Sequence, residues 1–436
     1  MFLEDSDMEK SNYEVQPKIK DRMYFKFCLY GFLKNQRFFD PFIILFFREM
    51  GISFLQIGTL FSIREVSTNI LEIPTGIIAD SYGRKKSMIF AFSSYIISFI
   101  IFYFFPKFLI YSVAMVFFAL GEAFRSGTHK AMILQYLKVK NLQEHKVYYY
   151  GHTRAASQFG SAISSLIAIG IVFFAKSYRP IFLFSIIPYF MGLLLMFTYP
   201  SYLDGEIEKI SGGWWYKMKK KSAGTLKEFK KMFLNTEALR SILNSSVFDG
   251  FFRASKDYLQ PILKSQAVAL PFFLFLSGKQ RTSLIVGLIY FILFLLTSTA
   301  SGKSARFVKR LKSLPFAINI TYISGFILLF LSGLFTNFKL FWAGSIFLIL
   351  LYIVQNLRRP MNVAYISDKI SHKTMASGLS VESQIKTIVV AIISPVIGFF
   401  ADRNGVGISL IIISFLFLFT LPFVIIKEKK GEKNGR

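Results

Sequence analysis

Charged side chains stand inside long apolar runs of this sequence, where a charge is costly unless it faces a cavity or a partner. Glu122 and Arg125 are three residues apart and therefore share one face of a helix. A carboxylate in such a place is a candidate for binding and releasing a proton. The full set of candidates for a solute- or proton-binding cavity is Arg37, Asp40, Glu65, Glu72, Glu122, Arg125, Asp249, Arg253, Arg358 and Glu382.

Several of these charges have an opposite charge at helical spacing. Residues three or four apart on a helix are within reach of each other. Ion pairs are therefore expected between Asp249 and Arg253, between Arg253 and Asp257, and between Arg37 and Asp40. A structural role is the alternative to a functional one, because such pairs can neutralise each other and hold helices together.

The elements that must position these charges are membrane helices. Of the 436 residues, 53% are hydrophobic and 52 are Phe, a composition that excludes an ordinary soluble domain. Apolar runs of about 20 residues, long enough to cross a bilayer core, recur along the chain. We expect an all-α integral membrane protein with twelve transmembrane helices, near 23–49, 53–79, 86–105, 108–136, 148–174, 180–202, 239–264, 282–301, 314–334, 338–366, 376–401 and 407–426.

The charge pattern orients these helices. The chain has 52 Lys+Arg against 25 Asp+Glu, net +27, and the cations are spread over short loops. This spread argues against a nucleic-acid partner, which needs a single basic face. Basic residues gather in alternate loops, in the central segment and near both ends, and such segments stay in the cytoplasm. We therefore expect a multi-pass protein of the cell (inner or plasma) membrane with both termini cytoplasmic.

The chain divides into five expected parts. A cytoplasmic tail (1–22) precedes a first six-helix bundle (23–202), a basic cytoplasmic linker (203–238), a second six-helix bundle (239–426) and a basic tail (427–436). In the linker, an aromatic and lysine-rich stretch precedes apolar residues at helical spacing: Leu226, Phe229, Met232 and Phe233. This pattern predicts a short helix on the membrane surface. A lipid sensor and a plain linker are the two alternatives for its role.

The two halves of the chain echo each other. Arg125 stands six residues before Ala131, and Arg358 has the same spacing to Ala364. The segment that runs from Gly76 through Asp80 is partly repeated as Gly-Phe-Phe-Ala-Asp-Arg-Asn-Gly over 398–405. Such a repeat implies two pseudo-symmetric halves with a binding site between them.

The segment Pro-Thr-Gly-Ile-Ile-Ala-Asp-Ser-Tyr-Gly-Arg-Lys-Lys over 74–86 lies between two long apolar runs. Gly83 can take a positive φ there, and Asp80 can accept hydrogen bonds from the amides of the next helix. The segment resembles the signature loop of the major facilitator superfamily of secondary transporters, Gly-x-Leu-Ala-Asp-Arg-x-Gly-Arg-Lys. The matching residues are Gly76, Ala79, Asp80, Gly83, Arg84 and Lys85, whereas Ile78 and Ser81 depart from the pattern.

The resemblance implies transport by alternating access, in which two halves rock about a central cavity. It assigns a gating role to the loop residues Gly76, Asp80, Gly83, Arg84 and Lys85, with Asp80 and Arg84 bracing helix ends in one state. Many proton-coupled exporters of the superfamily carry Arg-x-x-Gln-Gly in the fourth helix. The corresponding segment here is Phe-Phe-Ala-Leu-Gly over 117–121, and it lacks that Arg.

Enzyme and cofactor chemistry find little support in the residues. The single cysteine, Cys28, excludes an internal disulfide and a CxxC metal site. The four histidines have no His-Glu-x-x-His spacing, and Gly302-Lys303-Ser304 lacks the upstream glycine of a phosphate-binding loop. No catalytic residue, metal ion or cofactor is expected.

These observations lead to an expected function. The chain is interpreted as a secondary active transporter of a small molecule, ion- or proton-coupled, with efflux (an antiporter) favoured over uptake. Uptake of an anionic small molecule is one alternative, because cations outnumber acids in the apolar spans. A non-transporting membrane sensor or assembly partner with the same fold is the other. The expected partners are the solute, protons and membrane lipids, and the expected state is a monomer.

Overall fold

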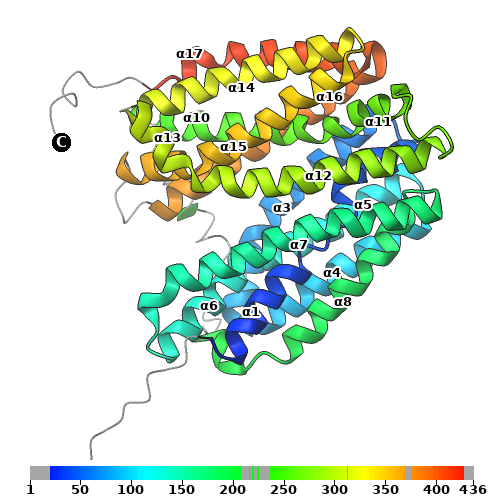
Figure 1. The fold of residues 1–436 in the computed structure, drawn as a ribbon. Coiled ribbons are helices and arrows are strands. Elements are labelled where there is room, and N and C mark those ends of the chain that lie inside the picture. The colour runs from blue at the N-terminus through cyan, green and yellow to red at the C-terminus, as the bar shows by residue number, and fades with distance from the viewer. Residues whose placement is uncertain are drawn as a thin grey trace, which may run out of the picture.

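The computed structural model describes residues 20–207, 216, 219, 223–224, 236–311, 313–369 and 375–426. Every regular element in these residues is a helix, and the helices form two groups that lie side by side (Figure 1). Most of the expected linker, including its predicted surface helix, lies outside the described residues. The same holds for the expected N-terminal tail up to residue 19 and for the tail 427–436.

The first group holds the N-terminal helices. They are α1 (Arg22–Leu33), η1 (Asp40–Phe42), α2 (Ile43–Glu49), α3 (Phe54–Tyr82), α4 (Arg84–Phe104), α5 (Phe108–Arg125), α6 (Thr128–Val139), η2 (Gln143–His145), α7 (Lys146–Ala175), α8 (Pro180–Phe197) and η3 (Ser201–Asp204). Within this group α4 packs against α5 and α8, α3 against α5, and α1 against α7. Buried aromatic rings fill the interior, as where Phe102 stacks on Phe182.

The second group holds the C-terminal helices. They are α10 (Thr236–Ser255), η4 (Lys256–Tyr258), α11 (Leu259–Ala269), α12 (Gly278–Gly302), α13 (Ser304–Leu311), α14 (Leu314–Asn337), α15 (Phe341–Lys369), α16 (Met375–Phe419) and α17 (Leu421–Val424). Here α14 packs against α15 and α16, and α10 packs against α16. The long α16 bends at Gly405, whose φ of 83° and ψ of 167° interrupt the helix.

Eight helical segments among the described residues are long and apolar enough to cross a membrane. The ranges expected from hydropathy fall mainly on helices, but several of them are interrupted. The range 23–49 is broken between α1 and α2, and 239–264 is broken at η4. The range 108–136 is broken between α5 and α6, where Gly127 takes the left-handed conformation with φ 72°. The last two ranges merge into the bent α16, followed by α17.

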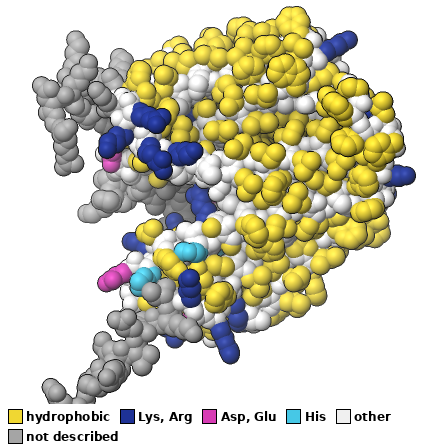
Figure 2. All heavy atoms as spheres, in the orientation of Figure 1, with side chains coloured by type: hydrophobic (Ala, Val, Ile, Leu, Met, Phe, Trp, Pro, Cys, Tyr) yellow, Lys and Arg dark blue, Asp and Glu magenta, His cyan; other side chains and the backbone are white. Residues whose placement is uncertain are grey.

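The surface suits a lipid environment. Figure 2 shows hydrophobic side chains over most of the visible face, and exposed examples include Leu109, Phe174 and Phe419. Lys and Arg gather on this face mainly at one end of the molecule, where the surface is hollowed between the two groups. We call this end, which holds the start of α1, the turn between α3 and α4 and the C-terminal residues of α17, the near end (Figure 1). The opposite end is the far end.

The two groups meet most closely along α3 and α16. Gly58 of α3 lies against the backbone of α16, and a Cβ atom built on it would stand 2.1 Å from the carbonyl oxygen of Ser394. Gly398 of α16 lies equally close to α3, with the corresponding position 2.2 Å from the carbonyl oxygen of Phe54. Glycine at these two positions therefore allows the backbones of the two helices to touch. A second contact between the groups joins α7 to α12.

Candidate functional site

A cavity of about 310 Å³ lies between the two groups of helices. Its wall comes from α3, α5, the turn between α5 and α6, α10 and α16. Six of the lining side chains are charged, three of each sign, and none of the lining residues is hydrophobic. The lining residues are Glu65, Thr68, Asn69, Glu72, Glu122, Arg125, Ser126, Gly127, Arg253, Ser383, Lys386 and Thr387. Ligand pockets are usually lined mostly by apolar groups. This wall instead offers ion pairs and hydrogen bonds on every side.

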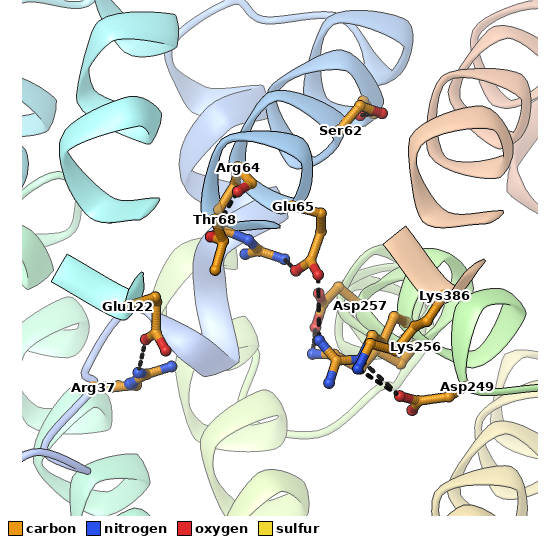
Figure 3. A network of polar contacts seen from close by, with 12 residues as sticks. Arg37, Ser62, Arg64, Glu65, Thr68, Glu122, Asp249, Lys256, Asp257 and Lys386 are labelled. Carbon is orange, nitrogen blue, oxygen red and sulfur yellow. Dashed lines mark hydrogen bonds and ion pairs between the residues drawn. The ribbon is translucent and has the colours of Figure 1, made fainter. Parts of the chain in front are cut away.

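Glu122 on α5 is held by two arginines. The Nη2 atom of Arg37, which follows α1, lies 2.5 Å from Glu122 Oε1 (Figure 3). Arg125 binds the other carboxylate oxygen, as its spacing of three residues predicts. Arg125 also donates from Nε to the hydroxyl of Tyr95 at 3.1 Å. Because α5 ends at Arg125, this side chain stands at the edge of the turn that forms part of the cavity wall.

A second charged network crosses from one group of helices to the other. Glu65 on α3 accepts from Arg64 Nη2 at 3.1 Å and from Arg253 Nη1 on α10 at 3.3 Å. Arg253 Nε reaches back to Asp249 Oδ2 at 3.1 Å, so the pair predicted four residues apart on one helix is formed. Lys386 on α16 lies 3.8 Å from the same Asp249 oxygen, and Figure 3 shows these side chains converging.

Two predicted ion pairs are wrong. Arg37 pairs with Glu122 and not with Asp40, because the chain leaves the helix after Leu33 and the spacing of three no longer places them on one face. Asp257 pairs with Lys256 at 2.7 Å and not with Arg253. The cause is again local: α10 ends at Ser255, and the 3-10 turn at Lys256 redirects the following side chains.

Some predicted candidates lie outside the cavity wall. Arg358 is fully buried, donates to Asn244 Oδ1 at 2.5 Å and to the carbonyl of Ile318 at 2.6 Å, and lies over the ring of Phe248. Glu382 accepts from Ser245 Oγ at 2.5 Å. These contacts fasten α15 and α16 to helices of their own group.

The predicted gating loop lies at the near end of α3, where the helix ends. Gly83 ends the helix with a φ of 99°, so its expected positive φ is confirmed. The amide of Lys85 in the next helix is bound by Asp204 Oδ1 at 2.6 Å, a role expected of Asp80. Lys85 Nζ donates to the carbonyls of Phe197 and Tyr199, and Arg84 Nη1 donates to the carbonyl of Ala131. Gly76 and Asp80 lie in the last two turns of α3.

At the far end, polar contacts tie the two groups together. Asp402 on α16 caps the start of α3, because its two oxygens accept from the amides of Phe54 at 2.9 Å and Leu55 at 2.8 Å. The buried amide of Gln260 on α11 accepts from the backbone of Ile44 at 2.8 Å and donates to the carbonyl of Asp40 at 2.9 Å. These bonds satisfy backbone groups of one part of the chain with side chains of the other.

Glu49 adds a third contact at the far end. Its Oε2 accepts from the amide of Tyr178 at 2.8 Å, and its Oε1 forms an ion pair with Lys279 of α12. The far end of the structure is therefore fastened across the two groups, whereas the near end is hollowed between them (Figure 2).

Sequence reasoning placed five of its ten candidates in the cavity wall, namely Glu65, Glu72, Glu122, Arg125 and Arg253. The wall residues absent from that set are Lys386 and the uncharged residues Thr68, Asn69, Ser126, Gly127, Ser383 and Thr387. A signal for them exists, because Glu65, Thr68, Asn69 and Glu72 have the spacing of one helix face, and Ser383, Lys386 and Thr387 have it too. A polar stripe inside an apolar helix marks a wall better than single charges do.

Comparison with known proteins gives a family match over most of the chain. The family model described as Major Facilitator Superfamily matches residues 31–383. An uncharacterized MFS-type transporter, YxaM, of Bacillus subtilis (strain 168) is 34% identical over 90 residues, which are 21% of this chain and 23% of that protein. The chain thus aligns with less than a quarter of that relative's length.

Solved structures share the fold. A mutant form of the nucleoside transporter NupG superposes with a TM-score of 0.73, covering 93% of this chain and 100% of that one at 13% identity. A POT family transporter in complex with a thioalcohol-conjugated peptide gives a TM-score of 0.63, covering 92% and 94% at 14% identity. At such identities the likeness concerns the fold alone.

Proposed function

This chain belongs to the Major Facilitator Superfamily, and from that membership we propose that it moves a small polar solute across a membrane by alternating access. The family makes it a multi-pass membrane protein of a transporter class. The observation that carries the finer proposal is the cavity of about 310 Å³ between the two groups of helices. A volume at the lower end of the usual range for ligand pockets, about 300–1,000 Å³, suits a small solute.

The proposed architecture has twelve membrane crossings in two six-helix bundles, with bundle boundaries at 23–202 and 239–426. In it, α1 with α2, α5 with α6, and α10 with α11 each count as one interrupted crossing, and α16 with α17 counts as two. Interrupted helices are common where transporters bind their cargo. The basic near end is proposed to face the cytoplasm, so that the hollow between the groups is open to that side.

The proposed cargo is hydrophilic. A lipophilic solute would have to displace water from three carboxylates and three cations without replacing their hydrogen bonds, which is costly. The balanced wall also gives no advantage to a purely anionic solute, although cations outnumber acids in the apolar spans as a whole. The cavity charges thus support a polar cargo over a lipophilic one.

Direction and coupling are proposed as proton-driven export. Export rests on the likeness of the loop at Gly76 to Lys85 to the loops of exporters. For coupling, Glu122 and Glu72 are the candidate carboxylates of the wall. A proton that binds Glu122 has to displace two guanidinium groups, whereas Glu72 has the neutral hydroxyl of Ser126 at 3.3 Å. Glu72 is therefore the better candidate for exchange.

A test of alternating access does not need the cargo. The chain has one cysteine, so Cys28→Ser gives a cysteine-free background. Ser126→Cys places a thiol in the cavity wall, and Ile57→Cys places one at a buried position of α3 next to Gly58, the residue that touches α16. An impermeant thiol reagent should label Ser126→Cys from the near side and Ile57→Cys from the far side. A protein fixed in one state labels at only one of these positions, and that result would overturn the proposal.

Transport itself requires flux measurements. A growth screen of a deletion strain against toxic compounds and sole nutrients should identify the cargo, and vesicles with and without a proton gradient should then give direction and coupling. Glu122→Gln and Asp80→Asn are expected to lose flux while still reaching the membrane. Wild-type flux in both variants would contradict the proposed roles of the cavity and the gating loop.

A further inference from the structure

The charges of the cavity wall fall into two classes according to their partners. Two of the three carboxylates are each engaged by two arginines: Glu122 by Arg37 and Arg125, and Glu65 by Arg64 and Arg253. Both arginines of the cavity wall, Arg125 and Arg253, therefore already form ion pairs with carboxylates. A ligand that sought any of these groups would have to break a charged contact that is already made.

Glu72 and Lys386 are the two wall charges that remain. Glu72 Oε1 has the hydroxyl of Ser126 at 3.3 Å, a neutral partner. Lys386 Nζ lies 3.8 Å from Asp249 Oδ2, the limit of an ion pair, and that carboxylate is already bound by Arg253 at 3.1 Å and by Gln355 at 2.6 Å. The wall therefore contains one carboxylate and one ammonium group that make only weak contacts with other protein groups.

These two side chains come from opposite sides of the cavity. Glu72 lies on α3 in the first group of helices, and Lys386 lies on α16 in the second. Both line the same cavity, and the ion-pair partner of Lys386 among the described residues is Asp249, not Glu72. Uncharged hydrogen-bonding groups lie beside them in the wall, namely Asn69, Ser383 and Thr387.

We propose that Glu72 and Lys386 bind the two ends of a zwitterionic solute, with its ammonium group at Glu72 and its carboxylate at Lys386. This inference rests on the proposed transport function and names the class of its cargo. An anionic solute without an ammonium group would pair with Lys386 but leave the charge of Glu72 without an opposite charge. A cationic solute without a carboxylate would pair with Glu72 but leave the charge of Lys386 without one. A neutral solute would leave both charges without a partner inside a low-dielectric protein, where such charges are costly.

The experiment uses the purified full-length protein and a panel of zwitterions: the standard amino acids, β-alanine and glycine betaine. Each binding zwitterion is compared with its analogue that lacks the cationic nitrogen and with its analogue that lacks the carboxylate. Binding is read by calorimetry and by the shift of the melting temperature. At least one zwitterion should bind, and each of its analogues should bind about ten- to a hundredfold more weakly, the loss expected for one charged hydrogen bond.

Charge-neutral variants give a readout that a structural role would not produce. Glu72→Gln should no longer bind the zwitterion but should bind the analogue that lacks the cationic nitrogen. Lys386→Gln should likewise no longer bind the zwitterion but should bind the analogue that lacks the carboxylate. The matched controls Glu144→Gln and Lys107→Gln change exposed residues outside the cavity wall and should bind as wild type.

Two results would overturn the inference. One is that no zwitterion of the panel binds the wild-type protein. The other is that a zwitterion binds but both variants keep their wild-type preference among the three analogues. Either result can occur while Ser126→Cys and Ile57→Cys still label from opposite sides, so a wrong cargo class is distinguishable from a failure of alternating access.

Discussion

Two segments of this chain share one pattern and do different work. The segments 76–83 and 398–405 both read Gly-x-x-Ala-Asp-x-x-Gly. In each, a helix runs through the Asp and is interrupted at the final glycine, with φ 99° at Gly83 and 83° at Gly405. They lie at opposite ends of the molecule, because α3 runs toward the near end and α16 runs toward the far end (Figure 1).

Their neighbourhoods differ. At the far end, Asp402 crosses between the groups and caps the start of α3. At the near end, the residues after Gly83 bond within the first group, through Asp204, Phe197 and Tyr199. In this state the far-end segment joins the two groups and can limit their separation, whereas the bonds of Lys85 stabilise the first group alone. The shared pattern supplies a helix end with an acidic residue, and the conformation decides which end is fastened.

The largest change in far-side labelling is expected when a bulky side chain is introduced where α3 touches α16. In Gly58→Leu the new Cβ would stand 2.1 Å from the Ser394 carbonyl oxygen, a backbone atom that cannot rotate away. Overpacking of this kind costs about 1–3 kcal/mol or more, and moving α3 away from α16 relieves it. Labelling of Ile57→Cys from the far side should therefore rise strongly.

Gly170→Leu is the matched control for Gly58→Leu. It lies in α7 with no atom within 4 Å of its Cβ position, so it adds the same side chain without a clash. If the two leucine variants labelled alike, the far contact would not be what holds the groups together.

A smaller shift is expected for Asp402→Asn. The amide keeps one acceptor oxygen and loses the charge, so one charge-assisted bond to the start of α3 is lost, worth about 1.5–3 kcal/mol. The far end should open more often, seen as faster labelling of Ile57→Cys. The neighbouring Arg403→Gln removes a charge that lies over the ring of Phe399 and should leave the labelling rate unchanged. If Ile57→Cys were labelled at the same rate in both variants, Asp402 would not contribute to holding the far end closed.

Hydropathy and charge spacing predicted much of the local structure. The apolar ranges fall mainly on helices, Gly83 has its expected positive φ, and Glu122 pairs with Arg125 three residues away. These features depend on residues close in the chain, where helix geometry fixes distance. The roles proposed for the cavity residues and the gating loop stay predictions.

The long-range contacts could not be predicted in this way. Arg37 and Glu122 are 85 residues apart, and Glu65 and Arg253 are 188 apart, so only the packing of helices brings them together. The echo between Arg125 and Arg358 is misleading for the same reason. Arg125 stands in the cavity wall at a helix end, whereas Arg358 is buried against Asn244 and Phe248 inside one group. Sequence spacing says which residues share a face but not what that face meets.

The near-end segment should behave differently from its far-end counterpart. Asp204→Ala removes the acceptor of the Lys85 amide at the start of α4, a helix cap worth about 0.5–2 kcal/mol. Because this bond lies within the first group, the melting temperature should fall while Ile57→Cys labels at the wild-type rate. A change in far-side labelling of the size produced by Asp402→Asn would contradict the distinction between the two segments.

The smallest effect is expected at the rim of the far end. Lys279→Met breaks the ion pair with Glu49, but the Lys279 side chain is 47% exposed, and exposed pairs contribute about 0–1 kcal/mol. Glu49 keeps its bond to the Tyr178 amide, so it is not left without a partner. Far-side labelling of Ile57→Cys should rise only slightly in this variant, and the difference from wild type should shrink at high salt, because salt already weakens the pair. An effect as large as that of Asp402→Asn would mean that long-range charge attraction holds the far end closed, and not the capping of α3 and the contact of two glycine-lined backbones.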